Sequence, residues 1–275
     1  MKLYPLLIMA NLALGVTGAA GVEIVAHRGA SHEAPENTLA SISLAWEENA
    51  DAAEVDVFVT SDGRIIAIHD PTTGRTAGAD LAVAESSFED LRKLDVGAWK
   101  GPQWKDERIP SLEDVLEILP PAKRLYIEIK CGEEILDPLT RVLAPWEKRA
   151  GQIVLIGFSY ELMSAAKRRF PHFLCHWLVS VEQIEGTNEW EPPIPEVAAR
   201  AQAAGFDGIS LGNAPALDAE AARIVRAHEL LLLVWTVNNA GRARALSALG
   251  VHSITTDRPG WLRKQLREAL SDPKR

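Results

Sequence analysis

The chain has 275 residues, 47% of them hydrophobic and 24% charged, a composition typical of a soluble globular protein and not of a disordered or collagen-like chain. Lys and Arg total 29 against 38 Asp and Glu, and the formal net charge of -9 argues against nucleic-acid binding. An anionic substrate would need a local positive centre, either basic side chains or a bound cation.

The N-terminus, residues 1–20, has the three parts of a secretory signal peptide. Lys2 supplies a short charged start, an apolar run follows from about Leu6 to Val16, and small residues close the segment. The alternatives are a membrane anchor or a buried first helix, and the run is shorter than the roughly 20 residues that span a bilayer, which disfavours the anchor. We expect a cleaved signal, a secreted or periplasmic protein without a stable membrane span, and a folded domain over residues 21–275.

Short β-branched runs alternate with amphipathic helical stretches from residue 23 almost to the end, which predicts repeated βα units in one α/β domain. Nine strands are expected, at Glu23–His27, Ala53–Thr60, Ile65–His69, Leu125–Lys130, Ile153–Gly157, Phe173–Val179, Gly208–Leu211, Leu231–Thr236 and Ser253–Thr256. Eight helices are expected, at Thr38–Glu48, Leu112–Leu119, Ile135–Arg149, Glu161–Arg169, Pro195–Ala204, Ala219–Glu229, Ala240–Leu249 and Pro259–Leu270. Eight parallel strands and one hairpin partner would account for this count as a (β/α)8 TIM barrel.

The hairpin is expected between the second and third strands, which are joined by residues 61–64 (Ser-Asp-Gly-Arg) with no helix between them. Asp-Gly between alternating apolar runs is a strong hairpin signal. A two-residue turn would pair Ser61 with Arg64, and counting back along the strands would place Asp56 opposite His69.

Two connections are long for a compact domain. Residues 71–110 contain Gly, Thr and Pro, the two tryptophans Trp99 and Trp104, and one modest helix near Phe88–Leu94. Residues 182–195 form a second long loop of unassigned role. A long connection usually has a function of its own, although a plain surface excursion is the alternative.

The densest polar signal follows the first strand, where residues 26–30 read AHRGA and residues 35–38 read PENT at the start of a helix. In a βα barrel the carboxyl ends of the strands carry the active site, so His27 and Arg28 are well placed for function.

Carboxylates recur at the ends of later strands. Glu54 and Asp56 alternate with valines and share one face of a strand, and Glu128 and Lys130 do the same on another. Neighbouring acids are costly to bury unless a cation neutralises them, and oxygen ligands suit Ca2+ or Mg2+. A solvent-facing polar edge is the alternative for the first pair.

At this point the chain resembles the glycerophosphodiester phosphodiesterase family, within the barrel phosphodiesterases that include phosphatidylinositol-specific phospholipase C. The matching motifs are HRGA at 27–30, PENT at 35–38, Glu54-x-Asp56, residues 60–63, His69-Asp70, EIK at 128–130, WTVN at 235–238 and TTDRP at 255–259. They span nearly the whole chain after the signal.

This resemblance implies one divalent cation, Ca2+ or Mg2+, held by Glu54, Asp56 and Glu128. It implies that His27 and His69 are the catalytic acid and base.

The resemblance also implies that Arg28 and Lys130 steady the phosphate and that Trp235 contacts the substrate. Glu36 and Asn37 would hold the residues of the site in place, as outer groups around metal and anion sites do. The family carries an insertion after His69-Asp70, so residues 71–110 are expected to form a small cap.

The expected reaction is metal-dependent hydrolysis of a glycerophosphodiester to sn-glycerol 3-phosphate and an alcohol, with water or the neighbouring glycerol hydroxyl as the attacking group. The nearest alternative is a lysophospholipase D or sphingomyelinase D-like enzyme that accepts a lipid tail. A barrel that binds phosphodiesters without cleaving them is a third.

Four further residues stay open between two interpretations. His176 and Trp177 lie near the end of a later strand and could line the substrate mouth or pack in the core. Cys131 and Cys175 lack the spacing of a zinc site and could be a disulfide or two buried free thiols.

Overall fold

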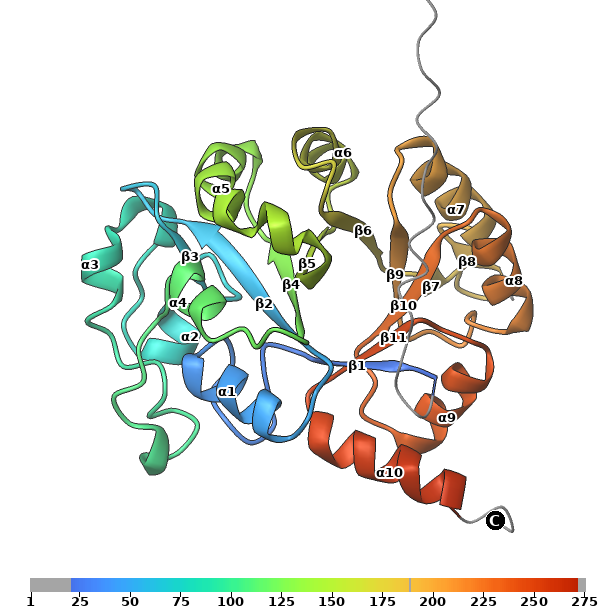
Figure 1. Cartoon of the computed structure of the whole chain (residues 1–275), viewed down its shortest axis with the longest axis horizontal. Coiled ribbons are helices and arrows are strands. Elements are labelled where there is room, and N and C mark those ends of the chain that lie inside the picture. The colour runs from blue at the N-terminus through green and yellow to red at the C-terminus, as the bar shows by residue number, and fades with distance from the viewer. Residues whose placement is uncertain (1–20, 188, 272–275) are drawn as a thin grey trace, which may run out of the picture.

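Eight apolar runs form a closed parallel barrel that helices surround (Figure 1). The computed structural model describes residues 21–187 and 189–271, so the predicted signal peptide lies outside the described residues. In order around the barrel the strands are β1 (Glu23–Ala26), β2 (Ala52–Val59), β4 (Arg124–Ile129), β5 (Ile153–Gly157), β6 (Leu174–Val179), β9 (Gly208–Gly212), β10 (Leu231–Trp235) and β11 (Ser253–Thr256). Strand β1 pairs in parallel with both β2 and β11, which closes the barrel. The predicted TIM barrel is confirmed.

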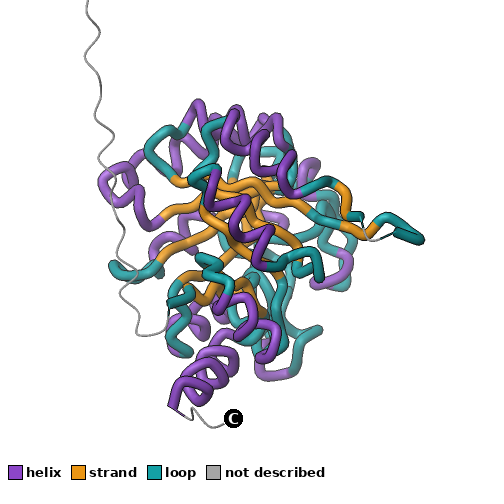
Figure 2. The backbone as a smooth tube through the Cα atoms, turned by 90° about the vertical axis from the view of Figure 1, so that its right-hand side faces the viewer, coloured by secondary structure: helices purple, strands orange, loops and turns teal. Residues whose placement is uncertain are grey.

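Helices on the outside connect successive barrel strands, and a last helix follows β11 (Figure 2). They are α1 (Leu39–Glu47), α4 (Leu112–Glu117), α5 (Leu136–Leu143), α6 (Tyr160–Arg169), α7 (Ile194–Ala203), α8 (Ala219–Ala227), α9 (Ala240–Ala248) and α10 (Pro259–Ser271). The helix expected over 135–149 is divided into η3 (Glu133–Ile135), α5 and η4 (Ala144–Gln152). Pro145, just after α5, has no N–H to continue the helical hydrogen bonds.

Apolar side chains fill two layers, because parallel strands are buried on both faces. Inside the barrel lie Val25, Ala52, Tyr126, Val154, Ile156, Leu178 and Leu233, with little or no exposure. A larger cluster fills the space between the strands and the outer helices. Each fully buried large aliphatic side chain contributes about 1.5–3 kcal/mol to stability, which fixes the strands and therefore their carboxyl ends.

The hairpin between β2 and β3 (Ile65–Ala67) forms, but its predicted register is wrong by one residue. Val59 pairs with Ile65 and Val57 with Ala67, so Asp56 lies opposite Ile68 instead of His69. The loop has three residues, 61–63, and ends at Gly63 with a φ of +76°. A three-residue loop that ends in a left-handed glycine is the common alternative to the two-residue turn.

The segment after β3 folds over one side of the barrel. It contains α2 (Gly74–Ala77), η1 (Val83–Glu85), α3 (Phe88–Leu91) and η2 (Pro102–Trp104). Its buried side chains, Val83, Phe88, Leu91, Val96 and Ile109, pack on Ile66 and Ile68 of the β3 region. The segment therefore has a small buried core, and residues 71–110 are called the cap below.

A short antiparallel hairpin, β7 (Glu182–Gln183) with β8 (Trp190–Glu191), lies in the loop between β6 and α7. The sequence did not predict it, because two-residue strands leave too little periodicity to detect. Within the described residues, no helix is both long enough and apolar enough to cross a membrane.

Candidate active site

Three carboxylates meet at the carboxyl ends of β2 and β4. Strand pairing places Asp56 directly beside Glu128, and Glu54 shares the Asp56 face of β2. Glu54, Asp56 and Glu128 each offer an oxygen within 4.8 Å of the others, and all three are buried. This is the metal-ligand set that the sequence predicted, gathered in one place.

The electrostatics of this triad suit a cation. Burial, followed by the charges of Asp56 and Glu128, raises the pKa of Glu54 well above its usual value. Burial and the charge of Asp56 likewise raise the pKa of Glu128. Glu54 Oε2 accepts a hydrogen bond of 2.8 Å from the Arg28 N–H, whereas its buried Oε1 has no hydrogen-bond partner among the described residues. Such an unsatisfied buried oxygen in a cluster of like charges fits a divalent-metal ligand.

Two cationic side chains flank the triad. Arg28 Nε lies 3.2 Å from Asp56 Oδ2, and Lys130 Nζ lies 2.8 Å from Glu128 Oε1 and 3.5 Å from Asp56 Oδ1. Burial alone would lower the pKa values of Arg28 and Lys130, but the neighbouring carboxylates raise both above their usual values. Both side chains are therefore charged at neutral pH, as phosphate binding requires.

The loop that follows β1 is held in an unusual conformation. Arg28 has a φ of +56° and Gly29 a φ of +81°. A Cβ atom on Gly29 would lie 2.4–2.7 Å from atoms of Ser41 in α1, so only glycine fits. Ser41 Oγ in turn donates 2.9 Å to the Arg28 carbonyl, which ties this loop to the helix.

Asn37 and Glu36 hold the ligands and the arginine in place. Asn37 Oδ1 accepts 3.0 Å from the Asp56 N–H, and its Nδ2 donates 2.9 Å to Asp56 Oδ2. Glu36 Oε1 accepts 2.9 Å from Arg28 Nη1. These contacts are of the kind that the resemblance implied for both residues.

His27 is paired with a carboxylate that the sequence interpretation did not single out. The backbone N–H of His27 donates a hydrogen bond of 2.9 Å to the Thr256 carbonyl at the end of β11. The side-chain Nδ1 of His27 lies 2.6 Å from Asp257 Oδ1. Asn238 Nδ2 donates 2.5 Å to the other Asp257 oxygen. Burial would raise the pKa of Asp257, but its hydrogen bond and charge interaction with His27 lower it. The sequence could have indicated Asp257, because it directly follows β11, the strand that pairs with β1.

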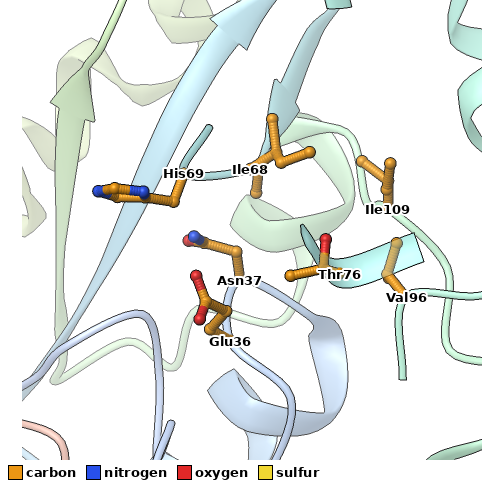
Figure 3. Close-up of a pocket in the computed structure, with 8 residues that line it drawn as sticks. Glu36, Asn37, Ile68, His69, Thr76, Val96 and Ile109 are labelled. Carbon is orange, nitrogen blue, oxygen red and sulfur yellow. The ribbon is translucent and has the colours of Figure 1, made fainter. Parts of the chain in front are cut away.

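His69 repeats this arrangement on the other side of the site. Its Nδ1 lies 2.6 Å from Asp70 Oδ1. His69, Glu36 and Asn37 line a small pocket whose opposite wall includes Thr76, Val96 and Ile109 of the cap (Figure 3). The pocket therefore has a polar wall, formed by Glu36, Asn37 and His69, and an apolar wall formed by cap residues such as Val96 and Ile109.

A model of the glycerophosphoryl diester phosphodiesterase family matches residues 27–261, most of the chain. The chain belongs to this family.

Relatives of known name extend this match. A glycerophosphodiester phosphodiesterase of Bacillus subtilis is 30% identical over 256 residues, covering 87% of this chain and 85% of that protein. One from Caldanaerobacter subterraneus is 29% identical over 243 residues, covering 87% of this chain and 95% of that protein. Among solved structures, an Oleispira antarctica phosphodiesterase in complex with its product sn-glycerol-3-phosphate superimposes with a TM-score of 0.77, at 25% identity, over 89% of this chain and 96% of the other.

Two aromatic side chains extend the site of this family member beyond Lys130. Trp235 and Phe158 pack edge to face with ring centroids 5.4 Å apart, and Lys130 Nζ lies 5.9 Å from the Phe158 centroid. Trp235 is anchored by a 3.1 Å hydrogen bond from its Nε1 to the Ser210 carbonyl. The sequence singled out Trp235 and missed Phe158, which follows β5 and is 44% exposed.

The interpretation of His176 and Trp177 as mouth residues is wrong, and the core interpretation holds. His176 is fully buried beside Tyr126, with ring centroids 6.1 Å apart. Trp177 is 7% exposed and packs outward on Tyr160. Both cysteines are free thiols, and burial raises the pKa of Cys131 to about 11.

A larger cavity lies away from this chemistry. It occupies about 1220 Å³, including open solvent, between the β7–β8 hairpin and the first turns of α7 and α8. None of the predicted site residues lines it.

Proposed function

We propose that this family member hydrolyses glycerophosphodiesters to sn-glycerol 3-phosphate and an alcohol. The observation that carries the proposal is one end of a barrel at which three buried carboxylates, two cationic side chains and two His–Asp pairs meet. The names of the relatives and the product bound to the Oleispira enzyme agree with it.

A divalent cation would offset the charge of the carboxylate triad, because its three carboxylates lie beside two flanking cationic side chains, Arg28 and Lys130. We propose that Glu54, Asp56 and Glu128 hold that cation, and that it is Ca2+ or Mg2+, because the donors are hard carboxylate oxygens.

When bound, the cation supplies positive charge against the negative charge that develops on the phosphoryl oxygens. Arg28 and Lys130 would bind the non-bridging oxygens from the protein side. Their carboxylate contacts already hold both groups in position, so little reorganisation is needed as the transition state forms.

His27 and His69 would move the protons. In each, Nδ1 carries the proton that is shared with an Asp oxygen at 2.6 Å, which leaves Nε2 as the nitrogen for proton exchange with the substrate. One Nε2 accepts the proton of the attacking oxygen, and the other donates a proton to the leaving alkoxide. Each transfer contributes roughly 100- to 10,000-fold to the rate.

The test is release of sn-glycerol 3-phosphate from glycerophosphocholine by the purified protein after EDTA treatment and after Ca2+ or Mg2+ is restored. We expect EDTA to abolish release and one of the two ions to restore it, which also selects the ion. Wild-type protein that stays inactive with either ion would overturn the proposal.

A second substrate class is favoured by the exposed apolar side chains. Trp99, Phe158 and Ile184 are the exposed large hydrophobic residues of the described chain. Phe158 and Ile184 lie on segments that follow the barrel strands β5 and β6, at the end of the barrel that carries the site. Trp99 lies beside Lys100, whose Nζ donates a hydrogen bond to the Ser31 carbonyl in the loop after β1. This arrangement suits a phosphodiester with a lipid tail. Choline release from lysophosphatidylcholine that exceeds glycerol 3-phosphate release from glycerophosphocholine would favour this class.

We also propose that the chain is exported, on the strength of the signal-peptide pattern in residues 1–20. N-terminal sequencing of the protein recovered from the periplasm or medium tests this, and a start near residue 21 is expected. Recovery of the intact N-terminus from the cytoplasm alone would contradict it.

A further inference from the structure

An arginine of the cap contacts the carboxylates that hold two different parts of the site. Arg75 lies in α2, and its Nη1 and Nη2 donate 2.9 and 2.8 Å to the two oxygens of Glu36. Its Nε donates 2.5 Å to Asp70 Oδ2. One guanidinium group therefore satisfies both oxygens of one carboxylate and one oxygen of another.

The remaining hydrogen bonds of these carboxylates reach the site itself. Glu36 Oε1 also accepts 2.9 Å from Arg28 Nη1, on the phosphate-binding side. Asp70 Oδ1 lies 2.6 Å from Nδ1 of His69, one of the two histidines proposed to transfer protons. Glu36 and His69 come from segments far apart in the sequence and face one pocket, next to the α2 residue Thr76 (Figure 3).

We propose that Arg75 is a positioning residue that fixes Arg28 through Glu36 and His69 through Asp70. This inference rests on the proposed function. The inference gives the cap a role in the reaction. Among the described residues, Arg75 is the one side chain that donates hydrogen bonds to both Glu36 and Asp70.

The charge states agree with such a clamp. Burial would raise the pKa of Glu36, but the hydrogen bonds and charges of Arg75 and Arg28 lower it. Burial would likewise raise the pKa of Asp70, which the hydrogen bonds from Arg75 and His69 lower instead. Both carboxylates are therefore ionised at neutral pH.

The contacts of Arg75 depend on the planar shape of its guanidinium group. Three nitrogens of Arg75 contact three carboxylate oxygens, whereas the ammonium of a lysine is a single point charge that cannot span them. The Arg75 side chain is 45% exposed and its partner Glu36 12% exposed, so the free energy of unfolding of each variant is compared with that of wild type before its activity is measured. Loss of activity in a folded variant would therefore report positioning.

The experiment compares Arg75→Gln and Arg75→Lys with wild type, with Arg108→Gln as the matched control. Arg108 is a cap arginine of similar exposure, 40%, paired with the carboxylate of Asp106. We expect Arg75→Gln to lower kcat/KM for glycerophosphocholine by about 10- to 100-fold, the usual effect of losing an outer hydrogen-bond partner of a site. Arg75→Lys should recover only part of this loss, and Arg108→Gln should stay within about twofold of wild type.

The two arms of the clamp have different signatures. Glu36→Gln should act mainly on KM, Asp70→Asn mainly on kcat, and Arg75→Gln on both. In the Glu36→Gln/Asp70→Asn background, Arg75→Gln should lower kcat/KM little further, because the two carboxylates through which Arg75 acts are already replaced.

Binding of sn-glycerol 3-phosphate by calorimetry gives a readout without turnover, and Arg75→Gln should weaken it about 10-fold. Wild-type activity with an unimpaired Arg75→Gln or Arg75→Lys variant would overturn the inference and leave the proposed function standing. An equal loss from Arg75→Gln with and without Glu36 and Asp70 would also overturn it. Wild-type protein that neither cleaves nor binds would instead overturn the proposed function.

Discussion

Replacing Asp257 with Asn should inactivate the protein through His27. Asp257 Oδ1 lies 2.6 Å from His27 Nδ1, and a hydrogen bond to a charged group is worth about 1.5–3 kcal/mol. Because this bond strengthens when the imidazole gains its second proton, its loss alone should lower kcat by about 10- to 150-fold. Asp257→Ala measures that loss.

Asp257→Asn should cost at least as much, for a reason that the contacts make specific. The 2.5 Å contact from Asn238 Nδ2 is shorter than the 3.3 Å contact from Ser31 Oγ, so the new amide oxygen would face Asn238. The amide NH2 group would then face His27 Nδ1 and place the imidazole proton on Nε2. That tautomer cannot accept a proton from the substrate.

The assay is kcat for release of sn-glycerol 3-phosphate at saturating glycerophosphocholine and metal, between pH 6 and 9. Asp207→Asn is the control, because Asp207 has a similar exposure of 29% and pairs with Lys167 2.6 Å away at the other end of the barrel. Its kcat should match wild type. A kcat for Asp257→Asn within twofold of wild type would refute the role of the pair, and a smaller loss than in Asp257→Ala would refute the tautomer argument.

Three further predictions follow from the site and the core. Glu54→Ala should lose metal and activity together, whereas His27→Ala should keep its metal and lose turnover, as measured by metal analysis and product release. Gly29→Ala should destabilise the fold by about 1–3 kcal/mol in denaturant unfolding, because its Cβ would clash with Ser41 and its φ is +81°. Burial lowers the pKa of His176 to about 3, so the unfolded chain takes up the proton first and stability falls by about 1.4 kcal/mol per pH unit from about 6.5 towards 3.

Each of these has a clear contrary result. Full activity in His27→Ala, or retained metal in Glu54→Ala, would contradict the assigned roles. A Gly29→Ala protein as stable as wild type would contradict the steric argument. For His176, the free energy of unfolding of wild type and His176→Leu is compared at pH 7 and pH 5; wild type should lose about 2 kcal/mol more than the variant. An equal loss in both would show that His176 does not carry the effect.

Much of the site could be predicted from the sequence because its residues follow strands. In a closed parallel barrel the carboxyl ends of all strands meet at one face, so His27, Glu54, Asp56 and Glu128 come together once the strands are found. The pairing of His27 with Asp257 was harder to predict, because it requires knowing that β11 closes the barrel against β1.

Two other differences have local physical causes. The β2–β3 register depends on whether the loop has two or three residues, and both lengths are compatible with Asp-Gly. The direction of His176 could not be predicted, because a strand buried on both faces has no polar side to set its orientation. His176 faces the barrel interior with Leu178, and Trp177 faces the outer helices.

The most direct test of the proposed reaction is the phosphorus NMR spectrum of glycerophosphocholine after incubation with the metal-restored protein. The account predicts one new phosphorus signal, that of sn-glycerol 3-phosphate, and no such signal with Glu54→Ala; a separate choline assay should give an equal amount of free choline. Unchanged substrate, or phosphocholine in place of sn-glycerol 3-phosphate, would contradict it.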